Sequence, residues 1–275
     1  MRNNEERLGT KHQNQSSPSS TTPLEFVTPT SFVELPSEGQ FYSEDHPLNN
    51  QKTLEIKEMT AKEEDILTSR ALLQKGVAID RLVSSLVVDK SIKPESLLIG
   101  DKNAILIQAR IGAYGQKYKS QITCPSCGEK SNYGFDLTEI EYVETELREG
   151  VERLPNNNLL IELSNGWKIE CKMLNGDDET RLTQMMQKKR KKKQPESPLT
   201  DMLNAIIVSV SGHTESEVIQ KAVAFMPAKD TRFLREAYQA AVPNVDMNMS
   251  FECPSCEYEQ EMEVPLDAEF FWPKQ

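Results

Sequence analysis

Cys124-Pro125-Ser126-Cys127-Gly128, near the middle of a 275-residue chain, and Cys253-Pro254-Ser255-Cys256, close to its end, are two copies of one cysteine motif. In each copy, two thiolates separated by two residues are placed to bind one tetrahedral metal ion from a tight turn. Residues 128–252 lie between the two pairs. We therefore predict one four-cysteine zinc ribbon that closes a long excursion of the chain, with the ligands Cys124, Cys127, Cys253 and Cys256.

The predicted zinc site is structural. Four thiolates fill the tetrahedral shell of Zn²⁺ and leave no position for water or substrate. Such a site contributes about 10–16 kcal/mol of apparent binding free energy in peptides at neutral pH. Closing the excursion costs only roughly 4 kcal/mol, because loop entropy grows with the logarithm of length. Two alternatives are a pair of reduced, metal-free motifs and a redox CxxC. The redox reading is weak, because neither motif begins a helix that would lower the pKa of a thiol.

Composition narrows the class of protein. The formal net charge is −11, which disfavours broad affinity for nucleic acid and favours protein partners. No apolar run approaches a membrane span, and the N-terminus lacks the apolar core of a signal peptide, so we expect neither membrane association nor secretion. Four of the 5 cysteines lie in the two motifs, which fits a reducing cytosol better than a disulfide framework.

The fold class predicted is α+β, in four regions. Residues 1–23 are polar and are expected to be disordered. Residues 24–145 form a helical domain that includes the first cysteine motif. Residues 146–244 form an inserted β-hairpin and helical module. Residues 245–275 hold the second motif and an aromatic C-terminus.

Capping residues and periodicity place the individual elements. Thr60 and Glu63 form a capping box for a helix over 61–68, and Asp101 is expected to cap a helix that ends at Gly112 or Gly115. Another helix is expected to begin at Asp177 and to run into the basic residues Lys188–Lys193. Further helices are predicted over 70–75, 78–88, 198–210, 215–225 and 229–241. Strands are predicted over 117–123, 131–136, 247–252 and 258–264, and around an Asn165-Gly166 turn over 159–163 and 167–173. Cys171, in the last of these strands, is expected to be a small buried apolar side chain rather than a fifth ligand.

No catalytic motif is present. The sequence contains no HExxH, GxSxG, Walker loop or dinucleotide fingerprint. Its three histidines, His12, His46 and His213, are scattered along the chain. The acidic group Asp177–Glu179 is explained by its place at a predicted helix N-terminus. We therefore predict a non-enzymatic protein with no catalytic residue.

The alternative function is a zinc-ribbon nucleic-acid-binding protein. The basic run Lys188–Lys193 favours it, because lysines bind phosphates, although a basic run is also favourable at a helix C-terminus. The charge of the second half of the ribbon argues against it. From 252 to 269 this half has no basic residue, and it carries Glu252, Glu257, Glu259, Glu261, Glu263, Asp267 and Glu269. The first half of the ribbon is less acidic, with Lys117, Lys119 and Lys130 near it.

The aromatic C-terminus is a candidate partner-binding segment. Phe270, Phe271 and Trp272 either pack back on the ribbon or anchor a partner, since three large aromatic side chains are costly to leave in water. Either role suits a protein that functions by binding other proteins.

Several stretches resemble one family. They are Leu35–Tyr42, Met59–Leu67, Leu98–Asn103, Arg110 with Tyr114-Gly115 and Tyr118, the first CPxCG, and the closing CPxC with Phe270-Phe271-Trp272-Pro273. Over residues 30–145 and 245–275 their order resembles the T4-like bacteriophage baseplate proteins of the hub-assembly group. The chain departs from that pattern at Glu257, where a glycine is usual, which bears on the turn after Cys256.

The resemblance implies a role in building the hub of a contractile-tail baseplate, as a hub component or an assembly chaperone. It implies other hub proteins as partners, and it implies no catalytic residue. The expected location is the host cytoplasm during assembly or the baseplate of the virion tail. As a mechanism, the ribbon would fix the two ends of the insertion while its acidic strand surface and aromatic tail dock on other hub proteins.

Overall fold

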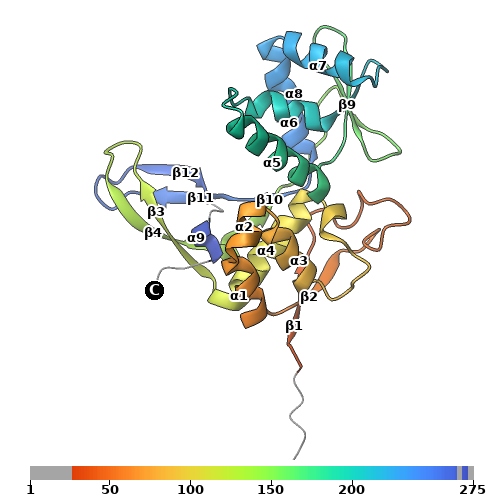
Figure 1. Cartoon of the computed structure of the whole chain (residues 1–275). Helices are drawn as coiled ribbons and strands as arrows, with labels where there is room; N and C mark the ends of the chain where they lie inside the picture. The colour runs from red at the N-terminus through yellow and green to blue at the C-terminus, as the bar shows by residue number, and fades with distance from the viewer. Residues whose placement is uncertain (1–26, 265–267, 272–275) are drawn as a thin grey trace, which may run out of the picture.

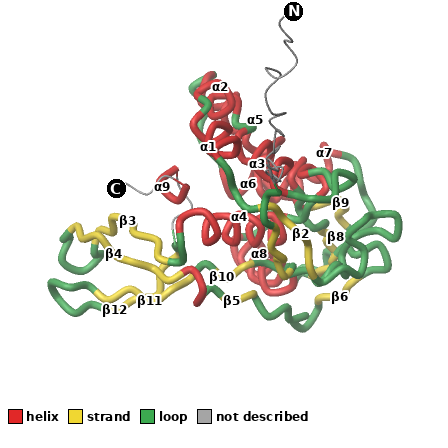
Figure 2. Tube along the Cα trace, turned by 90° about the horizontal axis from the view of Figure 1, so that it is seen from below, coloured by secondary structure: helices red, strands yellow, loops and turns green. Residues whose placement is uncertain are grey.

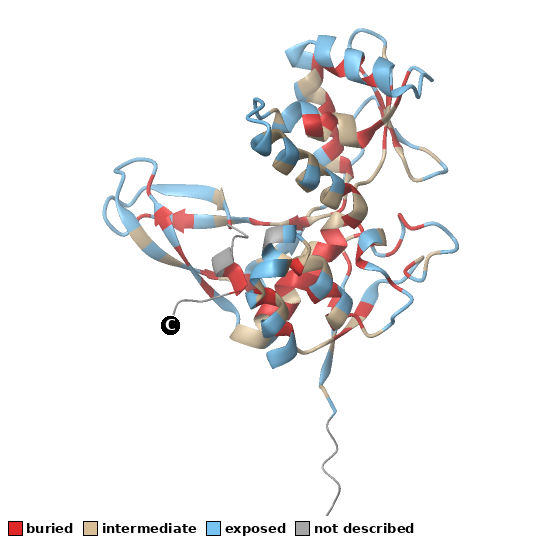
Figure 3. Cartoon of the chain, viewed as in Figure 1, coloured by how far each residue is buried: buried red, intermediate tan, exposed pale blue. Residues whose placement is uncertain are grey.

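The computed structural model of the chain describes residues 27–264 and 268–271. The segment 1–23, expected to be disordered, and Trp272 lie outside the described residues. Figure 1 shows two groups of helices, one above the other, and an arm of strands that extends to one side of the lower group. Buried positions concentrate inside each helical group and along the arm, while the tips of the arm are exposed (Figure 3). The α+β class predicted from the sequence is confirmed.

The lower group and the arm share the first hydrophobic core. The elements of the lower group are β1 (Thr30–Glu34), β2 (Thr53–Lys57), α1 (Ala61–Thr68), α2 (Arg70–Lys75), α3 (Ala78–Leu86), the 3₁₀ turn η2 (Pro94–Ser96) and α4 (Ile99–Tyr114). The predicted capping box is present at the start of α1, where Thr60 and Glu63 bind each other's backbone N–H groups. Helix α3 buries Leu82, Val83 and Leu86, as its 3.6-residue periodicity predicts, and it ends two residues earlier than expected.

The upper group has a core of its own, built from residues between 151 and 241. Its antiparallel sheet has the order β6-β7-β8-β9, with β6 (Val151–Arg153), β7 (Leu159–Glu162), β8 (Lys168–Cys171) and β9 (Ile207–Val210). Its helices are α5 (Gly176–Lys191), α6 (Pro198–Ile206), α7 (Ser216–Phe225) and α8 (Ala228–Ala241). Cys171 is fully buried in this core, as predicted, and burial raises the pKa of its thiol.

The helix predicted over 198–210 is too long. Helix α6 ends at Ile206, and the next four residues form strand β9, which pairs with β8. Three of those four residues, Ile207, Val208 and Val210, are β-branched, and β8 offers them an open edge for pairing. Tertiary pairing therefore overrides the helical pattern at this point.

Asp101 is not an N-cap. Helix α4 begins at Ile99, and Asp101 lies fully buried in its first turn. Its carboxylate accepts hydrogen bonds from the Ser37 backbone N–H (3.0 Å), the Ser37 hydroxyl (2.6 Å) and the Tyr42 hydroxyl (2.7 Å). The Tyr42 hydroxyl in turn accepts from the Leu98 N–H at 3.1 Å. Burial raises the pKa of Asp101 although these bonds oppose the shift. The network ties the loop after β1 to the start of α4.

A buried lysine joins the two helical groups. Lys102 of α4 places its Nζ 2.5 Å from Asp80 of α3 and 2.7 Å from Glu179 of α5. Helix α5 begins one residue before the expected start: Asn175 is its N-cap, paired in a capping box with Asp178, and Asp177 lies in the first turn. Because the Lys102 ammonium is buried, its ion pair with Glu179 holds α5 against the lower group, and the Thr180 hydroxyl of α5 also donates to Asp80 at 3.3 Å.

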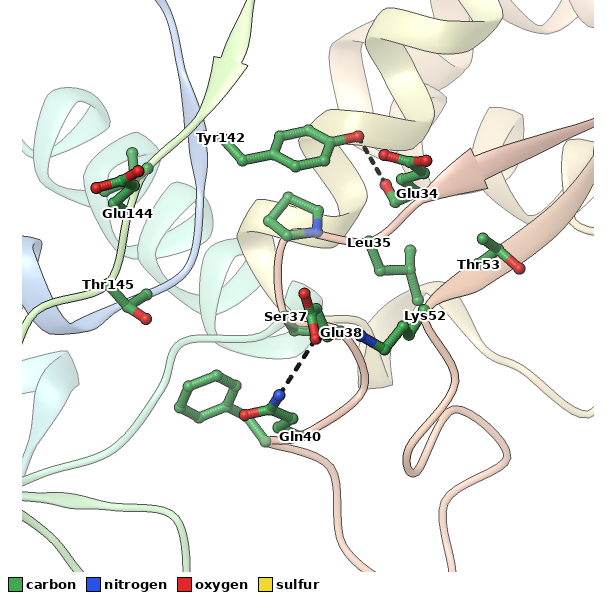
Figure 4. A pocket seen from close by; sticks show the side chains of 13 residues that line it. Glu34, Leu35, Ser37, Glu38, Gln40, Lys52, Thr53, Tyr142, Glu144 and Thr145 are labelled. Carbon is green, nitrogen blue, oxygen red and sulfur yellow. Dashed lines mark hydrogen bonds and ion pairs between the residues drawn. The ribbon is translucent and has the colours of Figure 1, made fainter.

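The chain segment that follows strand β5 (Glu141–Tyr142) lines a groove of about 560 Å³ in the lower group. Strand β5 pairs with β10 (Val245–Asp246), and the chain continues along one wall of the groove. Figure 4 shows Tyr142 pointing across to Glu34, whose carbonyl accepts a hydrogen bond from the Tyr142 hydroxyl at 2.9 Å. None of the helices described here combines the length and the apolar composition that a bilayer crossing needs.

We expect Tyr42→Phe to destabilise the lower group by about 2 kcal/mol, because it leaves the Leu98 N–H without its buried acceptor and removes one of the two hydroxyl donors to the Asp101 Oδ2 atom. Urea unfolding followed by circular dichroism measures the change. The control is Tyr114→Phe, which removes a hydroxyl that bonds Glu64 near the surface at 3.0 Å. Equal effects of the two substitutions would contradict the role given to the Asp101 network.

Candidate metal centre

The arm consists of two antiparallel hairpins, and each carries one cysteine motif at its turn. The first hairpin pairs β3 (Lys117–Thr123) with β4 (Lys130–Asp136), and the second pairs β11 (Asn248–Glu252) with β12 (Glu259–Glu263). Figures 1 and 2 both show the hairpins side by side with their turns at the same end. The flanking strands predicted from the sequence are confirmed to within a residue or two. We call the two hairpins together the ribbon.

The backbones of the two cysteine turns are equivalent. In the first, the Gly128 N–H donates to the Cys124 carbonyl at 2.9 Å, and in the second the Glu257 N–H donates to the Cys253 carbonyl at 2.9 Å. Gly128 has a φ of 75° and Glu257 a φ of 56°, so both occupy the left-handed region. The departure from glycine at Glu257 therefore leaves the turn after Cys256 intact, at the cost of backbone strain.

The four sulfur atoms form one cluster. The Sγ atoms of Cys124 and Cys256 are 3.8 Å apart, as are those of Cys127 and Cys253, and all four sulfurs lie within 4.8 Å of one another. A disulfide would bring two sulfurs to about 2.05 Å. Four thiolates at the usual Zn–S distance of about 2.3 Å from one tetrahedral ion stand about 3.8 Å apart. The spacing therefore fits a shared metal ion, and the predicted ligands come together from both ends of the excursion.

The surroundings of the cluster favour a thiolate at Cys124 and oppose one at Cys127. Cys124 and Cys253 are buried, while Cys127 and Cys256 lie at the exposed side of the turns. The backbone N–H groups of Cys127 and Ser126 point at the Cys124 sulfur and lower its pKa to about 7. At Cys127 a hydrogen bond from the Glu129 backbone lowers the pKa of the thiol, but the side-chain hydrogen bonds of Cys256, Cys124 and Cys253 outweigh it and raise this pKa to about 12. Because a metal ligand must be deprotonated, a bound cation has to supply the remaining stabilisation of the thiolates.

Aromatic side chains fill the space between the two hairpins. The Tyr133 ring of the first hairpin meets the Phe251 ring of the second edge-on, with centroids 5.0 Å apart, and the Tyr133 hydroxyl donates to the Ser250 carbonyl at 3.2 Å. Phe251 and Tyr118 are fully buried. The ribbon is therefore a two-layer structure with its own apolar filling, continuous with the first core.

The C-terminal aromatic residues described by the structure pack inside the chain. Helix α9 (Ala268–Phe271) places Phe270 edge-on against Tyr118, with ring centroids 5.2 Å apart, and both Phe270 and Phe271 are buried. Arg110 of α4, itself buried, donates from Nε to the Phe270 carbonyl at 2.6 Å and from a terminal nitrogen to the Gly115 carbonyl at 2.9 Å. The sequence analysis assigned no structural role to Arg110. The feature that could have indicated its burial is that it is a single arginine within an apolar helical stretch.

The other residues weighed in the sequence do not join the cluster. His46 stacks on Tyr42 with ring centroids 4.3 Å apart, and His213 lies 3.7 Å from Glu215 on the surface. In the basic run, Lys189 pairs with Asp201 and Arg190 with Glu196. Among the described residues, the four cysteines are the one group of His, Cys, Asp or Glu side chains whose ligand atoms converge as a metal site requires.

Comparison with known protein families assigns the chain to one of them. A family model described as "T4 bacteriophage base plate protein" matches residues 29–272. The chain belongs to this family. No curated protein and no solved structure matches it. The resemblance to T4-like baseplate proteins, drawn from short motifs, is thus confirmed, and the match also spans the middle of the chain, where the motifs gave little information.

Membership of the baseplate family gives the general function of the protein. This is a phage baseplate protein with a structural or assembly role, its partners are other baseplate proteins, and its place is the baseplate of the virion tail. Such a role is non-enzymatic in kind. The four-cysteine cluster of this baseplate protein is a candidate metal centre built into its arm.

We expect opposite results from two substitutions at equivalent positions of the cysteine turns. Gly128→Ala should weaken metal retention by about 1–2 kcal/mol, since a Cβ there meets no atom within 4 Å and only the left-handed backbone opposes it. Glu257→Gly should strengthen retention by up to about 1 kcal/mol, because it relieves the same strain. Competition with a chelator measures both changes. Shifts of the same sign would contradict the equivalence of the two turns.

Proposed function

We propose that this chain is a zinc-dependent, non-enzymatic assembly protein of the baseplate hub, acting as a hub component or an assembly chaperone through protein–protein contacts. The observation that carries the proposal is the convergence of four sulfurs from two distant motifs in a member of the baseplate family. During assembly the protein acts in the host cytoplasm, with other hub proteins as its partners.

The metal proposed is zinc, bound by Cys124, Cys127, Cys253 and Cys256. Four soft thiolates at tetrahedral spacing favour Zn²⁺ over the hard cations, which prefer oxygen ligands. With four protein ligands the ion has no open position, so its contribution is to hold the two hairpins together. The upper core lies between the two motifs in sequence, which supports a division of the chain into a helical domain, an insertion over 146–244 and a closing segment.

The ribbon is the proposed contact element. It extends from the lower helical group, and the outward side chains of its second hairpin are exposed and acidic. Since Phe270 and Phe271 are buried, their part in a contact is indirect: they fix the base of the ribbon through Tyr118 and Arg110. Trp272, proposed with them as a partner contact, follows directly in the chain.

Direct nucleic-acid binding is the second candidate. One observation favours it: Lys188, Lys191, Lys192 and Lys193 are exposed at the end of α5 and have no ion-pair partner among the described residues. The exposed carboxylates of the second hairpin oppose it, because they repel a phosphate backbone.

We expect Cys253→Ser to lose the bound zinc and to reduce co-purification with hub proteins at least tenfold, because one ligand and the closure of the ribbon are lost together. Metal analysis and pull-down from cells that express the hub proteins measure the two effects. Cys171→Ala is the matched control, since Cys171 lies in the other core and should leave both unchanged. Undiminished co-purification of the Cys253→Ser protein would overturn the proposed role of the ribbon.

A gel-shift titration across salt concentrations separates the two candidates. We expect only weak retardation of DNA or RNA, with no dependence on the lysines at the end of α5. A steep decrease of affinity with salt, abolished by neutralising Lys188 and Lys191–Lys193, would instead establish the nucleic-acid function.

A further inference from the structure

The ribbon has two outer faces, and side-chain alternation puts them on opposite sides. In the first hairpin Tyr118, Ile122 and Phe135 point inward, and in the second Phe251 points inward and meets Tyr133 across the filling. Because alternate residues of a strand face opposite ways, the residues between these point away from the filling on each hairpin. The two outward sets therefore lie on opposite surfaces of one plate.

The outer surface of the second hairpin is negative. We call it the acidic face; Glu252, Glu259, Glu261 and Glu263 point outward from it, all exposed. Glu252 and Glu259 are direct cross-strand partners, an arrangement in which two like charges destabilise a hairpin unless cations lie against it. None of the four has an ion-pair partner within the described part of the chain.

The outer surface of the first hairpin is positive. We call it the basic face; Lys117, Lys119 and Lys130 point outward from it, exposed and without ion-pair partners among the residues described. Asp136 shares this face as the cross-strand partner of Lys117 and offsets one of the three positive charges, so the face stays positive with two lysines in excess. The Asp136 carboxylate also accepts hydrogen bonds from Thr138 and Gln116. The plate thus presents opposite charges on its two sides, within a chain whose net charge is −11.

From this charge complementarity we infer that the ribbon is a self-association surface, on which the acidic face of one copy stacks against the basic face of a second copy. Both faces are regular two-stranded surfaces, so lysine side chains of one copy reach the glutamates of the next. The contact pairs two different surfaces, so it repeats from copy to copy and makes a ring if the rotation closes. Each face is small, so the contact is weak, depends on salt, and gains strength when copies are held close together.

This inference rests on the proposed function only in treating the ribbon as a contact surface. Sedimentation velocity of the zinc-loaded full chain tests it, at about 0.01 M ionic strength, where the Debye length is about 30 Å, and at about 1 M, where it is about 3 Å. We expect concentration-dependent association at low salt and a monomer at high salt. A monomer at low salt over the whole concentration range overturns the inference.

Charge-reversed variants identify the faces. The acidic-face variant carries Glu259→Lys, Glu261→Lys and Glu263→Lys, and the basic-face variant carries Lys117→Glu, Lys119→Glu and Lys130→Glu. Each alone should raise the dissociation constant of self-association at least tenfold. An equimolar mixture of the two should associate again, since one copy then has two basic faces and the other two acidic ones. A mixture that stays monomeric overturns the pairing.

A matched control distinguishes binding of the acidic face to the basic face from binding of the acidic face to the lysines at the end of α5. Lys191→Glu, Lys192→Glu and Lys193→Glu make the same change of net charge at the end of α5, and we expect association to persist. Loss of association in this variant alone would show that the acidic face binds the end of α5, and would overturn the inference. Metal analysis of every variant confirms that the ribbon is formed. If the wild-type protein co-purifies with hub proteins but does not associate with itself, this inference is overturned and the proposed function stands.

Discussion

The structure depends on one constraint: two pairs of sulfur atoms, separated by most of the second half of the chain, must meet at about the spacing of a tetrahedral site. Each cysteine turn holds its own pair through local backbone hydrogen bonds, but neither turn completes a site alone. Their meeting places the two hairpins back to back, buries Phe251 against Tyr133, and lets Phe270 close the base of the ribbon. The ends of the upper group are fixed as a result.

The two helical groups have separate apolar cores, which meet at Met173, and polar contacts also join them. Lys102 is buried between carboxylates of the two groups, an arrangement that fixes geometry more than it adds stability. The Asp101 network acts in the same way within the lower group, where one carboxylate organises the loop before it. Both features position elements, which is what a protein that works by contact requires.

Local signals in the sequence predicted most of the elements. The capping box at Thr60 and Glu63, the strands around both cysteine turns and the burial of Cys171 all follow from short-range patterns. The failures are long-range. Asp101 reads as a cap because its partners are Ser37 and Tyr42, far away in sequence, and β9 reads as helix because β8 supplies its pairing. The buried roles of Lys102 and Arg110 were not predicted for the same reason. The metal ligands were predictable because their motif carries its own chemistry.

The order of the two cysteine motifs along the chain has a consequence during synthesis. Residues 128–252 must leave the ribosome before the second pair of sulfurs exists, which takes on the order of ten seconds at about 5–20 residues per second. Throughout that interval the first hairpin lacks its partner layer, whereas by the end of it the upper group has every residue of its own core. Closure of the ribbon therefore cannot begin until residue 256 has been made, and a chain that terminates before this point never presents a finished arm to the growing particle.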